Sequence, residues 1–450
     1  MNNSSMDMVH GPLLKNIFIF ATPLMLTSLL QMLFNAADTI IVGKFAGDLS
    51  LAAVGACGSI IFLLTSLFNG MASGANVVIA QLFGKQDYDG VNKAVHTTML
   101  LAILGGIGLT IVALFSSKFF LSLMSTPSNI INLSDLYMKI YLCGGIFLLV
   151  YNFGAAVLRS KGDTKKPLYF LMISGLLNVI LNIIFVVVFH INVVGVAVAT
   201  VISQCVAAIL IWMTLIKETD ATHLDITQLK LDFHWVKEIL KIGIPAGLQG
   251  IVFSFSNIVI QSSINSFNSS VIVAGNSAAN NIENFVYIGM NAFAQATMTF
   301  TSQNVGANHK KSIHKILYIT LILSIISGFL VGFIAWLNGD FFLSLYTNEQ
   351  TVIDAGQMRL TYVTLLLVFN GIIDVFVFSM RGMGYSMMPT ILMLIGICGI
   401  RLIWLWTIFP IYRTLKTIYL CFPISWSITC IILGLLWIYT YKKEMNGNIS

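Results

Sequence analysis

Twelve long apolar runs restrict this 450-residue chain to one class of fold. Each run has about 20 residues or more, the length that an α-helix needs to cross a hydrocarbon core of roughly 30 Å. Only 9% of the residues are charged and 57% are hydrophobic, so a soluble protein of this composition would have a surface that water could not hydrate. Long runs, as opposed to short alternating ones, indicate helices and not a β-barrel. The runs lie near residues 15–42, 51–80, 95–117, 136–158, 168–189, 194–216, 238–265, 271–300, 313–337, 352–380, 387–410 and 416–440.

Lysine and arginine are distributed unevenly between the connections of these runs. If the N-terminus is cytoplasmic, 17 of the 24 basic residues fall on the cytoplasmic side. Cytoplasmic loops of membrane proteins carry an excess of Lys and Arg. We therefore predict a multi-pass protein of the cell inner (plasma) membrane, surrounded by the lipid bilayer, with both termini in the cytoplasm.

The chain also repeats itself at a constant offset of 222 residues. The pentapeptide Phe119–Leu123 (FFLSL) recurs as Phe341–Leu345, and Pro23 maps onto Pro245. Matches at one offset, spread over most of both halves, indicate an internal duplication. Each half has six spans, an even number, so both halves insert with the same orientation. The predicted fold class is an all-α integral membrane protein, with twelve transmembrane helices in two six-helix bundles related by a pseudo-two-fold axis along the membrane normal.

The longest polar stretch of the chain lies between the two halves, where the offset requires a boundary. We predict an N-terminal six-helix lobe at 1–216, a cytoplasmic linker at 217–237 and a C-terminal six-helix lobe at 238–450. Two similar bundles across a bilayer are an architecture that moves something across it.

Asp38 is a carboxylate inside the first span, where a charge costs about 2.5–3.5 kcal/mol. Gln31, Asn35 and Asp38 follow an i, i+4, i+7 spacing, so they share one face of the helix. Such a stripe faces another helix or a water-filled cavity, because lipid cannot satisfy its polar groups. The stripe is either an interhelical hydrogen-bond seam or an ion or proton site.

Neutral oxygen donors occur in two later spans of the same half. Asn178 and Asn182 are one helical turn apart, and Thr200 lies in the next span. Taken alone, the two asparagines are typical of packing contacts between membrane helices. If the helices meet, these oxygens and the carboxylate of Asp38 would form a ligand set for a small hard cation such as Na⁺.

Two further acids lie in spans of the second half. Asn280 and Glu283 share a face of one span, and Asn370 and Asp374 share a face of another. Arg401 lies near the middle of the eleventh span by count. One interpretation is a structural ion pair between Arg401 and either acid, and the other is that the acids contact a substrate or a second ion.

No intramembrane acid has an acidic counterpart in the other half. The halves therefore share a scaffold but not a site. We infer that they do different jobs, such as binding the coupling ion in one half and contacting a cationic substrate in the other. The offset places Ile260 opposite Asp38, Ile61 opposite Glu283 and Asn152 opposite Asp374.

Pro23 lies fifteen residues before Asp38 in the first span. Proline removes one backbone hydrogen bond and permits a kink, although it is also common in the first turn of a helix. Our hypothesis is a hinge: the first helix bends at Pro23 when Asp38 changes its bound ion.

Signals for catalysis or ATP use are absent from the sequence. It has no G-x-x-x-x-G-K-[ST] motif, no evident pair of nucleophile and base, and no histidine cluster. The six cysteines lie in or beside apolar runs without a CxxC pair, which is typical of buried free thiols. We predict that the chain is not an enzyme, needs no cofactor, does not bind nucleic acid, is a monomer and draws on an ion gradient.

Several motifs are similar to those of the MATE (multidrug and toxic compound extrusion) family, in its bacterial branch. They are spread over the whole chain and are jointly specific. The resembling segments are Asp38–Gly43 (DTIIVG), Ala80–Gly84 (AQLFG), Leu158–Lys165 (LRSKGDTK) with Pro167, Gly243–Gly247 (GIPAG) and Gln303–Ala307 (QNVGA).

The resemblance implies a cation-coupled antiporter that exports organic cations and other amphipathic drugs by alternating access. Asp38 matches the family's N-lobe acid, and Asn178, Asn182 and Thr200 match positions around it. Many relatives carry a second aspartate where this chain has Asn182. An amide ligates Na⁺ through its oxygen but cannot take up a proton, which favours Na⁺ over H⁺ as the coupling ion. A lone carboxylate can still carry a proton if it is buried.

In the second half, Asp374 matches an acid on helix 10 of bacterial relatives. The glutamate that some relatives carry in helix 7 is absent here, where Ser256 or Asn257 is nearby, so Glu283 would be the remaining second acid. The alternative function is a flippase for lipid-linked precursors, from the same superfamily. Such proteins tend to carry several arginines or lysines in a central cavity, whereas here we expect only Arg401 deep in a span.

Overall fold

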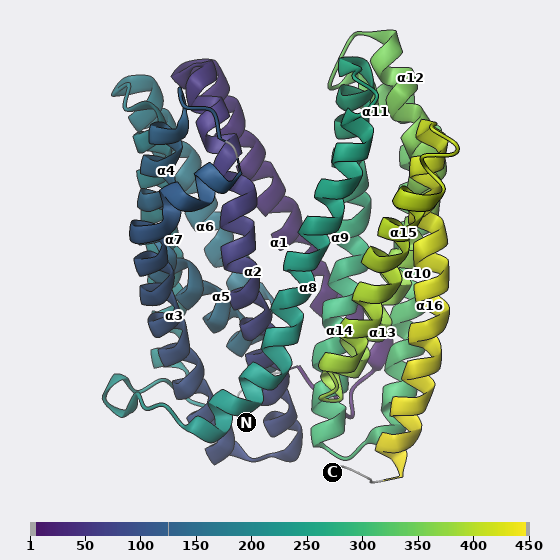
Figure 1. Cartoon of the computed structure of the whole chain (residues 1–450). Coiled ribbons are helices and arrows are strands. Elements are labelled where there is room, and N and C mark those ends of the chain that lie inside the picture. Colours follow the sequence, from purple (N-terminus) through teal and green to yellow (C-terminus); the bar gives the residue numbers. More distant parts are fainter. Residues whose placement is uncertain (1–5, 125, 447–450) are drawn as a thin grey trace. The chain divides into compact units, whose positions relative to one another are not determined.

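The computed structural model describes residues 6–124 and 126–446, and every regular element within them is a helix. Contacts divide the chain into two compact units. Unit 1 contains Leu26–Gly247, and unit 2 contains Asp7–Met25 together with the chain from Leu248 on. In Figure 1, which is coloured along the sequence, unit 1 runs from purple to teal and most of unit 2 from green to yellow.

Two long helices are divided between the units. Helix α1 (Leu13–Ile41) passes from unit 2 to unit 1 after Met25, and α8 (Phe233–Asn265) passes from unit 1 to unit 2 after Gly247. These crossing points are separated by the offset of the sequence repeat, so the duplication extends to the exchange of helical segments. The boundaries between the two units therefore lie inside α1 and α8. They differ in kind from the predicted lobes 1–216 and 238–450, which describe the duplicated halves of the sequence and stay a prediction.

Unit 1 is a helical bundle that includes the second half of α1. Within it α3 packs along α5, and α7 packs against α5 and α6. Gly70 and Gly74 of α2 allow its backbone to touch Gly243 and Gly247 of α8, where any Cβ atom would collide. The other elements of unit 1 are η1 (Val42–Ala46), α2 (Asp48–Lys85), α3 (Tyr88–Leu123), α4 (Ile131–Cys143), α5 (Gly145–Ser160), α6 (Lys165–Asn182), η2 (Ile183–Val188), α7 (Asn192–Lys217) and η3 (Ile226–Gln228).

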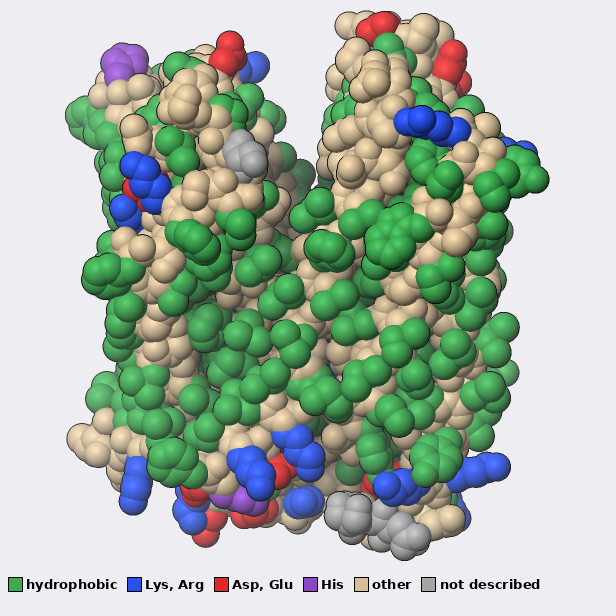
Figure 2. Space-filling model, in the orientation of Figure 1, with side chains coloured by type: hydrophobic (Ala, Val, Ile, Leu, Met, Phe, Trp, Pro, Cys, Tyr) green, Lys and Arg blue, Asp and Glu red, His purple; other side chains and the backbone are tan. Residues whose placement is uncertain are grey.

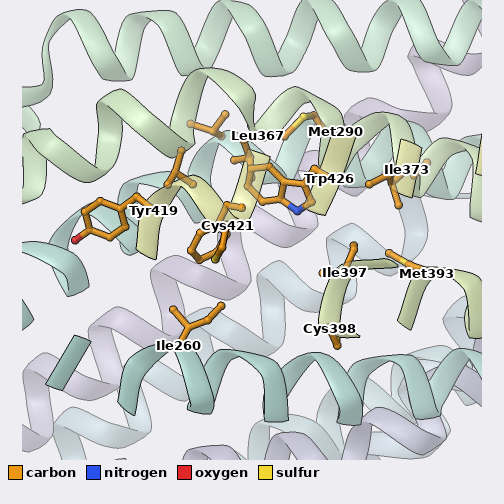
Figure 3. Packing of buried hydrophobic residues seen from close by; sticks show 14 of the residues in the cluster. Ile260, Met290, Leu367, Ile373, Met393, Ile397, Cys398, Tyr419, Cys421 and Trp426 are labelled. Atoms are coloured by element: carbon orange, nitrogen blue, oxygen red, sulfur yellow. The ribbon is translucent and has the colours of Figure 1, made fainter. Parts of the chain in front are cut away.

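Unit 2 is organised around α9, which packs against α10, α12 and α13, while α16 packs against α13. Its core combines residues from several helices, including Met290, Ile373 and Trp426, as Figure 3 shows. Its other elements are α9 (Ser270–Gly306), α10 (Lys310–Leu337), α11 (Gly339–Ser344), α12 (Gln350–Arg359), η4 (Leu360–Thr364), η5 (Leu365–Leu367), α13 (Val368–Gly382), α14 (Met387–Leu394), η6 (Ile395–Gly399), α15 (Ile400–Thr407) and α16 (Leu415–Met445).

The helices account for the predicted spans in two ways. Ten helical stretches of the described chain are long and apolar enough to cross a bilayer, and the pair α4 and α5, bent by 47° at Gly144, makes an eleventh span. The predicted span 271–300 is α9, which has 37 residues but interrupts its apolar face with polar ones. Its side chains contribute much of the polar chemistry described below.

Side chains follow the pattern of a membrane protein on the face drawn in Figure 2. Hydrophobic side chains cover the middle of each unit, and Lys and Arg side chains gather mainly towards one end. In unit 2 both described ends of the chain lie at one end of the bundle. The Asn304 Nδ2 donates to the carbonyl of Met8 at 3.0 Å, and Lys310 forms an ion pair with Glu444 at 3.3 Å.

Candidate functional site

Unit 1 has an open cavity of about 270 Å³ lined by residues of α1, α4, α5, α6 and α7. Its polar lining includes Asp38 on α1 and Thr200 on α7. Polar and aromatic groups share the wall, so the cavity can hold water or a small polar guest. The lining residues are Gln31, Phe34, Asn35, Asp38, Tyr141, Leu148, Tyr151, Asn152, Leu171, Ser174, Gly175, Asn178, Thr200, Ser203, Gln204 and Ala207.

The four residues predicted to form an ion site lie in one chain of hydrogen bonds. Asn182 donates from Nδ2 to Oδ1 of Asp38 at 2.5 Å and to Oδ1 of Asn178 at 3.2 Å. Asn178 in turn donates to Oγ1 of Thr200 at 3.3 Å. The network joins α1, α6 and α7, because the one-turn spacing of the two asparagines puts both on the same face of α6.

The amide of Asn182 is the pivot of this network. The residue is fully buried, and its Oδ1 has no hydrogen-bond partner in the described chain, while its NH₂ group serves the carboxylate of Asp38. This orientation suits an ionised carboxylate. If the amide turned over, its oxygen would face Asp38, where it would ligate a metal cation or accept a hydrogen bond from a protonated carboxyl group. One rotation therefore prepares the site for either Na⁺ or H⁺.

Two π-helical segments flank the network. Segment η1 begins four residues after Asp38, and η2 begins immediately after Asn182. Such insertions are frequent at functional sites, because they re-aim side chains and disturb the regular i to i−4 ladder. Asn35, also predicted for this site, lines the cavity one turn before Asp38, and no side-chain hydrogen bond joins the two residues in the structure.

The sequence analysis missed most of the cavity wall, including Tyr141, Tyr151 and Gln204. Gln204 donates to Oη of Tyr141 at 3.5 Å, and the hydroxyl of Tyr151 donates to the carbonyl of Pro167 at 3.0 Å. The bend at Gly144 directs α4 and α5 differently, and sequence periodicity gave no sign of that bend. A tyrosine in an apolar run is also common in an ordinary core.

Glu283 forms a buried ion pair in unit 2, but its partner is Arg359. The guanidinium donates from Nε to one carboxylate oxygen at 2.9 Å and from Nη2 to the other at 2.6 Å. It also donates to Oδ1 of Asn276 at 2.6 Å and to Oδ1 of Asn280 at 3.0 Å. The interpretation that pairs Arg401 with Glu283 or Asp374 is therefore wrong, because Arg359 occupies both carboxylate oxygens of Glu283 and no acid lies within ion-pair distance of Arg401 in the described chain.

Asp374 lies in a separate network on α13. The Tyr287 hydroxyl donates to its carboxylate at 2.5 Å, and Asn291 donates to the Tyr287 oxygen at 3.1 Å. Gln295 extends the line with a bond to Asn291 at 2.8 Å. Tyr287, Asn291 and Gln295 follow Glu283 along α9 at four-residue spacing, so one polar stripe of α9 serves both acids without bringing the two acids together.

The remaining predicted residues lie outside these networks. Asn257 is exposed on α8, and Asn370 is half-buried on α13. Neither makes a side-chain hydrogen bond within the described part of the chain. Pro23 lies inside α1, two residues before that helix passes between the units, and Pro245 has the same place in α8.

The sequence model of one family of membrane transporters matches this chain twice, once in each duplicated half. The model named MatE matches residues 23–184 and 245–407, two segments whose starts are separated by the offset of the repeat. The chain belongs to the MatE family. It is thus a multi-pass membrane transporter.

Curated relatives cover most of the chain. A probable multidrug resistance protein, YpnP of Bacillus subtilis, is 28% identical over 397 residues, which are 88% of each protein. The multidrug export protein MepA of Staphylococcus aureus is 23% identical and covers 98% of this chain and 96% of its own length. The family and its bacterial branch, suggested by the motifs, are confirmed.

Solved structures with the same fold show the helical arrangement. A multidrug resistance MATE transporter in an outward-facing conformation matches with a TM-score of 0.92 at 21% identity, over 99% of this chain and 100% of that one. A transporter of the MOP superfamily from Pyrococcus furiosus, described as having a binding pocket of reversed polarity, matches with the same score and identity over 99% of each chain. The predicted fold class of twelve helices in two bundles is confirmed.

Proposed function

We propose that this chain exports organic cations or other amphipathic drugs in exchange for Na⁺ or H⁺, by alternating access in the inner membrane with both termini cytoplasmic. The observation that carries the proposal is the hydrogen-bonded line from Asp38 through Asn182 and Asn178 to Thr200, beside a cavity inside unit 1. The names of the relatives, which describe multidrug resistance and export, supply the substrate class.

The coupling ion acts at Asp38 in this proposal. It is the one carboxylate of the cavity lining, and the nearest polar groups are amides and a hydroxyl. A cation that binds one conformation better than the other shifts the populations by its difference in binding free energy. We propose Na⁺ as the preferred ion, with Asp38, Asn178, Asn182 and Thr200 as its ligands, because amide oxygens ligate a metal ion but hold no exchangeable proton.

The experiment is efflux of a fluorescent organic cation from proteoliposomes that contain the purified protein. An imposed Na⁺ gradient at equal pH is compared with a pH gradient in potassium buffer. Faster efflux with Na⁺ supports the preferred ion, and efflux driven by the pH gradient alone assigns the coupling to H⁺. No gradient-dependent flux would refute the antiporter.

The second candidate function is a flippase for lipid-linked precursors. The sequence argument against it counted Arg401 as the single deep cation, but Arg359 and Arg381 are also buried in unit 2. A buried cationic group suits a phosphate-bearing substrate. The same vesicles, loaded with a fluorescent polyprenyl-phosphate lipid, test it: gradient-dependent flipping without dye efflux would replace the first proposal.

A further inference from the structure

An aromatic ring of α1 lies directly against the backbone of α6. A Cβ atom built on Gly175 of α6 would collide with Cδ2, Cε2 and Cζ of Phe34 on α1. Glycine inside a helix is less favourable than alanine, so a glycine in the middle of α6 needs a packing reason. The reason here is close approach, because any side chain at this position would occupy the space of the Phe34 ring.

The contact between Phe34 and Gly175 lies beside the proposed ion site on both helices. Phe34 precedes Asp38 by four residues on α1, so the two side chains share one face of that helix. Gly175 precedes Asn178 by three residues and Asn182 by seven, which places all three on one face of α6. Two contacts therefore join these faces: the ring of Phe34 on Gly175, and the hydrogen bond from Asn182 to Asp38 at 2.5 Å.

The cavity of unit 1 adjoins both of these contacts. Phe34, Asp38, Gly175 and Asn178 all line it, and the side chains of Phe34 and Asp38 are half-buried. On the side of the cavity, side-chain packing cannot set the separation of the two helices. The separation at Asp38 then depends on how closely the ring of Phe34 approaches α6.

The internal duplication separates this contact from the shared scaffold. The offset of 222 residues places Ser256 at the position of Phe34 and Ile397 at the position of Gly175. Both residues are buried in unit 2, where a hydroxymethyl group replaces the ring and a branched side chain replaces the hydrogen of glycine. The carboxylate of Asp38 is not duplicated either. The contact thus accompanies the acid of the ion site and is absent from the half that lacks this acid.

We infer that Phe34 is a positioning residue for the coupling ion: its ring, placed on Gly175, sets the distance from Asp38 to the amides of α6. A bound metal ion requires its ligands at fixed distances, and residues that hold such ligands in place change metal affinity by about 10- to 100-fold when they are replaced. The same distance matters for a proton, because the hydrogen bond from Asn182 favours the ionised form of the carboxyl group. The inference rests on the proposed export function and adds the contact that sets its ion affinity.

The test is a double-mutant cycle on the two residues in contact. Gly175→Ala forces the ring away from α6, Phe34→Ala removes every ring atom that would collide, and the double variant combines the two changes. Gly108→Ala is the matched control, because a Cβ atom on this glycine of α3 in the same unit meets nothing within 4 Å. The probe is Na⁺ alone, exchanged for K⁺ at constant ionic strength. Its half-saturating concentration is obtained from the melting temperature of the purified protein in detergent.

Gly175→Ala should raise the half-saturating concentration of Na⁺ about tenfold. Its melting temperature without Na⁺, and its maximal rate of dye efflux from proteoliposomes at saturating Na⁺, should change little. In the Phe34→Ala background the same substitution should alter the half-saturating concentration by less than about twofold, because no ring remains to be displaced. The control should match wild type.

A glycine with a purely structural role would give a different result. Gly175→Ala would then lower the melting temperature at every Na⁺ concentration and leave the half-saturating concentration unchanged, which would overturn the inference. An equal loss of affinity with and without the Phe34 ring would also overturn it. If Gly175→Ala does not fold, Phe34→Ala decides: it should raise the half-saturating concentration by itself, and a wild-type value would refute the positioning role.

The same variants separate this inference from the proposed function. If wild type responds to a pH gradient but not to Na⁺, they are compared by the pH of half-maximal efflux, where a tenfold change in affinity is about one pH unit. If neither Na⁺ nor H⁺ acts on wild type, the export function fails and the inference falls with it. If wild type responds and Gly175→Ala responds equally, the inference alone fails.

Discussion

Replacing the carboxylate of Asp38 by an amide is the sharpest test of the ion site. Asp38→Asn keeps the shape of the side chain and its place beside Asn182, so the bundle should fold and insert with little change in thermal stability. The charge is lost, and with it the ability to exchange one cation for another. Ion exchange is what couples the gradient to export in our proposal, so gradient-driven efflux should fail.

The magnitude follows from the charge that Asp38 would present to a bound cation. Two unit charges about 4 Å apart attract each other by about 4 kcal/mol at an effective dielectric constant of about 20. Each 1.4 kcal/mol is about a tenfold change in an equilibrium constant, so the affinity for the coupling ion should fall roughly 100- to 1,000-fold. At a sodium concentration below saturation, efflux should slow by a similar factor.

The assay is dye efflux from proteoliposomes over a series of sodium concentrations, with protein orientation and amount equalised. Asp48→Asn is the matched control, because Asp48 is an exposed carboxylate in the first turn of α2. The control should transport like wild type. Full gradient-driven efflux by Asp38→Asn would refute the site, whatever the sodium dependence of the control.

Three further predictions concern stability and movement. Glu283→Gln should lower the free energy of unfolding by about 3–5 kcal/mol, because it leaves Arg359 buried without its counter-ion. A second change, Arg359→Met, should recover part of this loss. Melting temperatures in detergent check both variants, and an unchanged melting temperature in Glu283→Gln would contradict the ion pair. Burial alone would raise the pKa of Glu218, but hydrogen bonds from Lys161 and Lys166 hold this pKa below its ordinary value of 4.5. The contribution of Glu218 to the stability of the fold is therefore complete above pH 4.5, and it is lost as the pH falls through the lower pKa of the folded state. Stability measured between pH 7 and pH 3 should therefore drop in wild type more than in Lys161→Ala. Pro23→Ala should slow transport and change its sodium dependence, because the bend that follows ion binding is lost, and normal transport by this variant would remove the hinge.

Asp38 and its partners were predictable because each step rests on a local rule. The polar stripe of the first span follows from helical spacing, and the pair Asn178 and Asn182 follows from the same spacing on another span. The cost of polar groups in lipid then requires the stripes to meet inside the protein. What the sequence did not contain is the direction of each amide, which the fold decides.

Arg359 shows where sequence reasoning stopped. It is one of the seven basic residues that the predicted topology leaves outside the cytoplasmic side, and α12, which begins at Gln350, places Arg359 about 14 Å along the helix axis. The sequence alone thus indicates that Arg359 needs a buried partner. It does not identify that partner, because Arg359 on α12 and Glu283 on α9 are related by no periodicity of the sequence.

The two prolines connect the duplication to the ion site. Helix α1 is continuous from unit 2 through Pro23 to Asp38 in unit 1, and α8 passes the other way two residues after Pro245. A bend at either proline alters the direction of a helix that belongs to both units. Because the acid occurs on α1 and not on α8, ion binding acts on one crossing helix alone. Pro23→Ala should therefore change the sodium dependence of transport, whereas Pro245→Ala should slow transport and leave its sodium dependence unchanged. Equal changes in sodium dependence for both variants would show that the crossing helices are equivalent, and would place the coupling elsewhere.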